Sequence, residues 1–143
     1  MEPKYEFLEH VSDAYIAAYG RSLEEAFQNA ALAMFEVMTD THKIKQRIED
    51  KISVDGWDEK ALLYNWLEQL LLKFEIERKL YSKFDVSELI HADNEWKLRA
   101  TAFGELFDTS KHEPRTEVKA VTYHQMEIGR RNGTYVLKFI LDL

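Results

Sequence analysis

The sequence predicts an α+β fold, a single domain in which two helices pack on a mostly antiparallel β-sheet with a C-terminal β-hairpin. Three observations support this prediction. Two segments carry apolar residues at helical spacing, several shorter segments alternate apolar and polar residues, and an Asn-Gly pair at residues 132–133 separates the last two of them. The 143 residues are 45% apolar and 31% charged, which suits one buried core, so we expect one domain over residues 1–143.

Local signals place the helices and the earlier strands. Ser22 with Glu25 three residues later forms a capping box, so the first helix begins there and its apolar stripe ends near Thr39. Asp58 caps a second helix, whose wide apolar face predicts an end at about Tyr81. Alternating or β-branched runs predict strands at residues 5–7, 16–18, 47–54, 84–90 and 96–103, and a loop follows at 104–115.

The C-terminal hairpin can be predicted in more detail, because a two-residue type I′ turn at 132–133 fixes which residues lie opposite one another. Glu127 then lies across from Lys138, which makes an opposite-charge cross-strand pair. Continued outward, the same pairing sets Tyr123 across from Asp142. In this register one face of the hairpin is mostly apolar and the opposite face carries the charged pair, which supports the register.

The face that carries Asp142 is the main candidate for function. The predicted register places Tyr123, Lys119 and Glu117 on this face, and the chain's last carboxylate, at Leu143, is next to Asp142. Two adjacent carboxylates repel each other, and a hard divalent cation or a lysine relieves that repulsion. The alternative is an ordinary solvated strand end, which the hairpin alone favours.

Composition narrows the classes of function. There is no cysteine, which excludes disulfides, thiolate metal sites and cysteine nucleophiles. The net charge of −7 argues against direct, sequence-specific binding of nucleic acid and suits a basic protein or a cation. The longest apolar stretch, at 62–74, is interrupted by polar residues, and the N-terminus lacks a signal-peptide core. We expect a soluble, cytoplasmic protein without a membrane partner.

The histidines have competing interpretations. His124 would face the apolar side of the hairpin and is predicted to be packed and hydrogen-bonded. His10 is three residues from Asp13 and could support a metal site or be structural. His112 and Glu113, on the predicted loop, could contact a partner or be ordinary loop residues.

Four segments resemble the archease family, and together they extend the resemblance over residues 5–143. They are KHEPRTEVKAVTYHQM at 111–126, the terminal Asp142-Leu143, the opening YEFLEHVSD, and the helix SLEEAFQNAALAMFEVMTD. Archeases are small metal-binding proteins that assist the RtcB-type RNA ligase, which joins tRNA halves with GTP and manganese. The resemblance implies a non-catalytic activator that promotes guanylylation of the ligase and its multiple turnover in tRNA splicing.

The resemblance also implies a metal site. The family's first acidic ligand falls on Asp13, its penultimate one on Asp142, and its last residue on Leu143. Such oxygen ligands suit calcium first, with magnesium and manganese as alternatives. The usual H-T-A-D-x-G pattern departs here at Val11 and Tyr15, and the missing glycine restricts the backbone beside the first ligand.

Two other functions remain open on the sequence. Asp13 and Asp142 could hold a cation that activates water in a stand-alone metal-dependent hydrolase. The protein could also be a chaperone-like modulator of another tRNA-modifying enzyme, such as a methyltransferase. Lys119, and with it Glu117, could contact the ligase or simply face solvent, and a monomer is compatible with the sequence.

Overall fold

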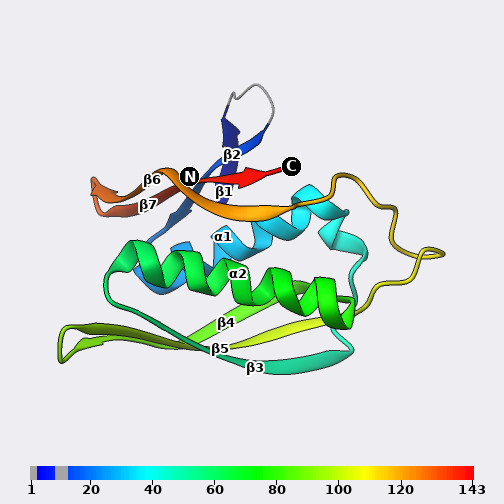
Figure 1. Cartoon of the computed structure of the whole chain (residues 1–143), viewed down its shortest axis with the longest axis horizontal. Coiled ribbons are helices and arrows are strands. Elements are labelled where there is room, and N and C mark those ends of the chain that lie inside the picture. Colours follow the sequence, from blue (N-terminus) through cyan, green and yellow to red (C-terminus); the bar gives the residue numbers. More distant parts are fainter. Residues whose placement is uncertain (1–2, 9–12) are drawn as a thin grey trace.

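Two antiparallel β-sheets enclose two helices in the computed structural model, which describes residues 3–8 and 13–143 (Figure 1). The order along the chain is β1 (Tyr5–Leu8), β2 (Asp13–Gly20), α1 (Leu23–Met38), the 3-10 helix η1 (Thr41–Lys43), β3 (Ile48–Gly56), α2 (Glu59–Glu77), β4 (Lys79–Ala92), β5 (Glu95–Leu106), β6 (Ala120–Arg131) and β7 (Thr134–Asp142). The predicted α+β class, with two helices and a C-terminal hairpin, is confirmed.

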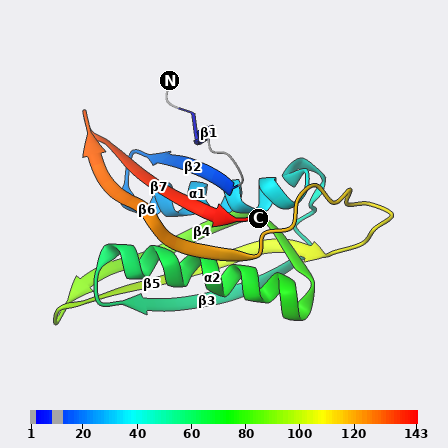
Figure 2. The same ribbon diagram turned by 45° about the horizontal axis from the view of Figure 1, so that its top comes forward.

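The strands form two separate sheets, where the sequence had predicted one. The four-stranded sheet has the order β1-β2-β7-β6 and the three-stranded sheet has the order β3-β5-β4. The helices lie between them, with α1 contacting β2 and β4, and α2 contacting β3 and β6 (Figures 1 and 2). Each helix therefore has a sheet on both sides, which explains why both are so rich in buried apolar residues.

Both helices begin where the capping signals predict. The Ser22 hydroxyl accepts the Glu25 amide at 3.1 Å, and an Asp58 carboxylate oxygen accepts the Ala61 amide at 2.7 Å. No described helix is long and apolar enough to cross a membrane.

The second helix ends earlier than the predicted Tyr81. Arg78 adopts the left-handed conformation, with φ of 57°, and its amide bonds the Phe74 carbonyl, which closes α2 at Glu77. Tyr81 instead lies in β4, where its hydroxyl donates to Asp50 of β3 at 2.6 Å. A helix end made by arginine instead of glycine gives no clear sequence signal.

The hairpin turn and the pairing nearest to it are as predicted. Asn132 and Gly133 have positive φ angles of 52° and 81°, as a type I′ turn requires, and Glu127 pairs with Lys138. The strand β6 then accommodates three extra residues between Thr122 and Glu127, where Gln125 also has a positive φ of 56°. We call this irregularity the β6 bulge (residues 123–126). It changes the partners on β7 of the β6 residues that precede it, 120–122.

Two predictions fail because of the β6 bulge. Tyr123 does not lie opposite Asp142, whose partner on β6 is Ala120. His124 is not packed in the core but exposed, and Val121 takes its place across from Leu141.

Candidate functional site

The predicted acidic residues Asp13 and Asp142 lie directly across from each other. Asp13 is the first residue of β2 and Asp142 the last of β7, and the two are paired in the antiparallel ladder. Figure 2 shows the end of β7 beside the start of β2. Residues paired in this way point to the same face, with Cβ atoms about 5 Å apart. Asp142 is exposed and Asp13 is half-buried, so the pair can be reached from solvent.

The donor set of this strand end fits a hard divalent cation. Carboxylates directly opposite each other repel, and a shared cation converts that repulsion into attraction. Leu143, next along the chain and half-buried, can add main-chain oxygens to the two side chains. Tyr15, which stands where the family pattern has glycine, pairs with Ile140 one rung further along the same face. His10 and Val11 lie outside the described residues.

The segment between the two sheets, residues 107–119, ends at this site, and we call it the crossing segment. The Lys119 amide donates to the Asp142 carbonyl at 2.7 Å. Three residues earlier the Thr116 amide donates to the Val37 carbonyl at 3.1 Å, near the end of α1. Three residues of extended chain span about 10 Å at most, so the last turn of α1 lies close to the strand end.

Lys119 and Glu117 both have exposed side chains on the crossing segment. The register from which they were placed on the face of Asp142 is wrong beyond the β6 bulge, and Ala120 occupies the position across from Asp142. The main-chain bond from Lys119 nonetheless keeps that residue next to the strand end.

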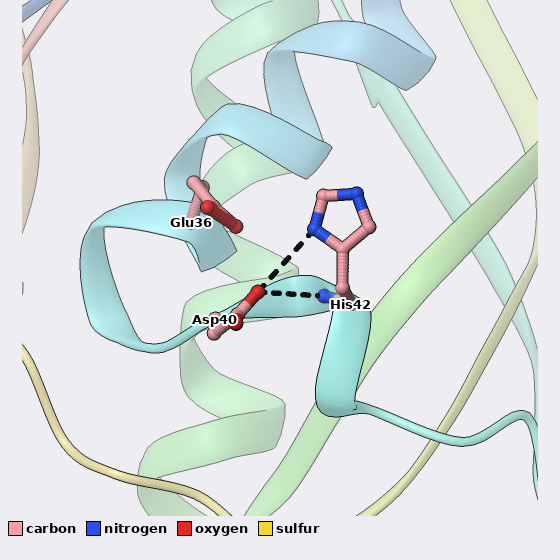
Figure 3. A group of neighbouring side chains, drawn as sticks. All are labelled: Glu36, Asp40 and His42. Carbon is pink, nitrogen blue, oxygen red and sulfur yellow. Dashed lines mark hydrogen bonds and ion pairs between the residues drawn. The ribbon is translucent and has the colours of Figure 1, made fainter.

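A second acidic group, which the sequence did not reveal, lies where α1 ends (Figure 3). Glu36, Asp40 and His42 offer ligand atoms within 4.8 Å of one another. Glu36 accepts the Thr41 amide at 2.9 Å and the Thr41 hydroxyl at 2.8 Å, and pairs with the Arg115 guanidinium at 2.9 Å. Burial raises the pKa of Glu36, but these hydrogen bonds outweigh it and hold that pKa below its usual value.

The positive charge of Arg115 already balances that of Glu36. This ion pair attaches the crossing segment to α1, which explains the group better than a metal centre does. Asp40 accepts the His42 amide at 3.0 Å and lies 3.3 Å from a ring nitrogen of His42, which holds η1 in place (Figure 3). Arg115, the partner of Glu36, is distant in the sequence, so no local pattern indicated their ion pair.

His112 is buried and has a structural role in the described fold. It is 0% exposed, and its ring Nδ1 accepts the Asp108 amide at 3.0 Å. Its Nε2 must then carry the proton, which it donates to Glu105 at 2.9 Å. The Lys45 amide donates to the same carboxylate oxygen at 2.8 Å. Glu113, by contrast, is exposed, and its carbonyl accepts the Thr39 hydroxyl at 2.9 Å.

The protein is a small α+β domain in which two sheets enclose two helices. Its acidic pair lies where β2 begins and β7 ends. The model of the Archease protein family (MTH1598/TM1083) matches residues 5–143. The proteins named "Protein archease" of Sulfolobus acidocaldarius and Sulfurisphaera tokodaii are each 49% identical over 140 residues, which cover 98% of this chain and 99% of the relative. This chain belongs to the archease family, so the resemblance inferred from the sequence is confirmed.

Solved structures agree with this assignment. The solution structure of protein 1598 of Methanobacterium thermoautotrophicum matches with a TM-score of 0.86 and 45% identity, covering 98% of this chain and 99% of that one. The crystal structure of an archease from Thermotoga maritima, whose description calls it a possible chaperone, matches with a TM-score of 0.60 over 96% of each chain. It is 20% identical and supports the fold alone.

Proposed function

We propose that this protein is an accessory factor that binds a divalent cation at Asp13 and Asp142 and activates an RtcB-type RNA ligase. It would promote guanylylation of the ligase and its multiple turnover without joining RNA itself. Membership in the archease family supports this general role. The observation that carries the site is the direct pairing of Asp13 with Asp142.

The position of the site suits a contact with a partner. The pair lies at the end of its sheet, and the exposed Asp142 side chain is accessible to another protein. A bound cation would neutralise a strand end that otherwise concentrates negative charge. Calcium is the ion we expect first, because the ligands are hard oxygens and an exposed strand end does not impose the strict octahedral geometry that magnesium requires.

Metal binding can be tested without the ligase. A ligand that binds only the folded protein stabilises it by about 2.7 kcal/mol at a concentration one hundred times its dissociation constant. An unfolding entropy of about 2.1 cal/mol/K per residue, over 143 residues, converts this into a rise in Tm of about 9 °C. Saturating calcium should produce such a rise over EDTA-treated protein, and Asp142→Asn should remove it.

The matched control for that experiment is Glu49→Gln, which removes one exposed charge from β3 in the other sheet. It should keep the calcium response. In EDTA, Asp142→Asn should be as stable as wild type or slightly more so, because it removes a like-charge pair. A full calcium response in Asp142→Asn would exclude this residue as a ligand.

The activity is tested with the ligase, GTP and manganese. Wild-type protein should accelerate formation of the guanylylated ligase and raise the number of turnovers, while Asp142→Ala should do neither and still fold. Normal activation by Asp142→Ala would refute the role of the strand end. Phosphoester turnover by the isolated protein, lost in Asp13→Ala, would support a hydrolase instead. Capture of a tRNA methyltransferase but no ligase would support the chaperone-like role.

A further inference from the structure

Tyr123 of the β6 bulge stacks on Tyr64 of α2. The two ring centroids are 4.4 Å apart and the ring planes differ by 4°. Tyr64 is half-buried, whereas Tyr123 is 51% exposed. One face of the Tyr123 ring is thus covered by Tyr64, and the tyrosine still presents a large aromatic surface to solvent.

The β6 bulge is what brings Tyr123 to α2. In the uninterrupted register predicted from the turn, Tyr123 would lie across from Asp142, in the ladder with β7. The three extra residues release it from that ladder, at the cost of a left-handed backbone at Gln125. A non-glycine residue in that conformation costs about 1 kcal/mol or more, so the surrounding contacts must hold it there.

Two carboxylates of α2, Glu68 and Asp58, act electrostatically on the stacked rings. Glu68 lies one turn further along α2 than Tyr64, on the same side of the helix. Burial first, and then the Glu68 carboxylate, raise the pKa of Tyr64. For Tyr123 the pKa is likewise raised by burial, by Tyr64 and by the Asp58 and Glu68 carboxylates. Asp58 is the N-terminal cap of α2, so both carboxylates are fixed on the same helix as Tyr64.

We propose that Tyr64, Tyr123, Glu68 and Asp58 form a docking site for an arginine side chain of a basic partner protein. A guanidinium group stacks on an exposed aromatic face and pairs with carboxylates beside it. The charge complementarity extends to the whole chain, whose net charge is −7. The same carboxylates repel phosphate, which disfavours a nucleic acid whose bases would stack on the ring.

This site goes beyond the proposed function, because it needs neither the cation nor Asp142. We would titrate the full-length protein with a tetra-arginine peptide by isothermal calorimetry, in EDTA and at low ionic strength. Tyr123→Ala should weaken binding about 5- to 30-fold, while Tyr123→Phe should retain it, since the ring provides the attraction. Glu68→Gln should weaken binding, and Asp142→Asn should bind as wild type does.

Glu49→Gln is the control for net charge and should bind nearly as well as wild type. A thermal unfolding curve for each variant confirms that it is folded, which the exposure of Tyr123 leads us to expect. The proposal is overturned if Tyr123→Ala binds the peptide as tightly as wild type, or if Glu49→Gln weakens binding as much as Glu68→Gln. Tighter binding of oligouridylate than of the peptide, dependent on Tyr123, would overturn it in favour of RNA.

Discussion

Replacement of Glu105 by glutamine tests how the crossing segment is attached to the three-stranded sheet. Glu105 is 4% exposed, and one of its oxygens accepts both the Lys45 amide and His112 Nε2. Its other oxygen lies 3.4 Å from both Arg47 and Lys111. Glutamine keeps the shape but removes the charge, and its amide group would face the two cations.

The size of the effect follows from these contacts. A hydrogen bond to a charged group is worth about 1 kcal/mol more than a neutral one, and two such bonds are weakened. The pairs with Arg47 and Lys111 add only a few tenths of a kcal/mol each, because both cations are substantially exposed. We therefore expect Glu105→Gln to lose about 2–3 kcal/mol, which for 143 residues lowers Tm by about 7–10 °C.

The pH dependence gives a second, independent check. Burial raises the pKa of Glu105, but the Lys45 amide, His112 and the nearby positive charges outweigh it and lower the pKa in the folded state. A lowered folded-state pKa means that the stabilisation is present above the unfolded value of about 4.3 and is lost as pH falls through the folded value. The deficit of Glu105→Gln should thus be largest near pH 7 and shrink below about pH 4.

The assay is thermal unfolding followed by circular dichroism over this pH range. Glu113→Gln, an exposed carboxylate on the same segment, is the control and should change Tm little at any pH. A Glu105→Gln variant as stable as wild type at pH 7 would refute the reasoning. So would a deficit that stays constant while Glu105 becomes protonated.

Two further substitutions test how α1 and the three-stranded sheet are built. Ser22→Ala removes the hydroxyl that accepts the Glu25 amide and should cost about 1 kcal/mol, or about 3 °C in Tm, whereas Ser22→Asp should restore stability. Gly104→Ala would drive a methyl group into the Leu80 carbonyl of the neighbouring strand β4, and we expect a loss of about 3 kcal/mol or more in urea unfolding; a stable Gly104→Ala protein would mean that β4 can move away from β5.

The parts of the fold that depend on short-range signals could be predicted from the sequence. Ser22 and Asp58 marked the helix starts, and Asn132-Gly133 marked the turn, because each acts on backbone groups within three residues. The division into two sheets could not be predicted, because alternation shows that a strand has two unlike faces and not which strand is its neighbour.

The candidate site, too, could be predicted only where short-range signals determine it. The hairpin signal identified Asp142, but the β6 bulge shifts the register and places Tyr123 against Tyr64 of α2, and no signal within β6 indicates that contact. Asp13 could be predicted as a site residue only from the family resemblance. In the structure the pairing of β2 with β7 places it opposite Asp142. The bond between Glu105 and His112 escaped notice because each residue alone is compatible with a solvated loop.

The crossing segment has a mechanical consequence. Its main chain or its side chains are attached at Arg78, at Glu105, at the end of α1 and at Asp142, so consecutive attachments are only a few residues apart. A chain bonded at such short intervals cannot move far without breaking one of these contacts. A displacement of the strand end at Asp142 would therefore be opposed first by the contacts to the last turn of α1 and then by the bond to the three-stranded sheet.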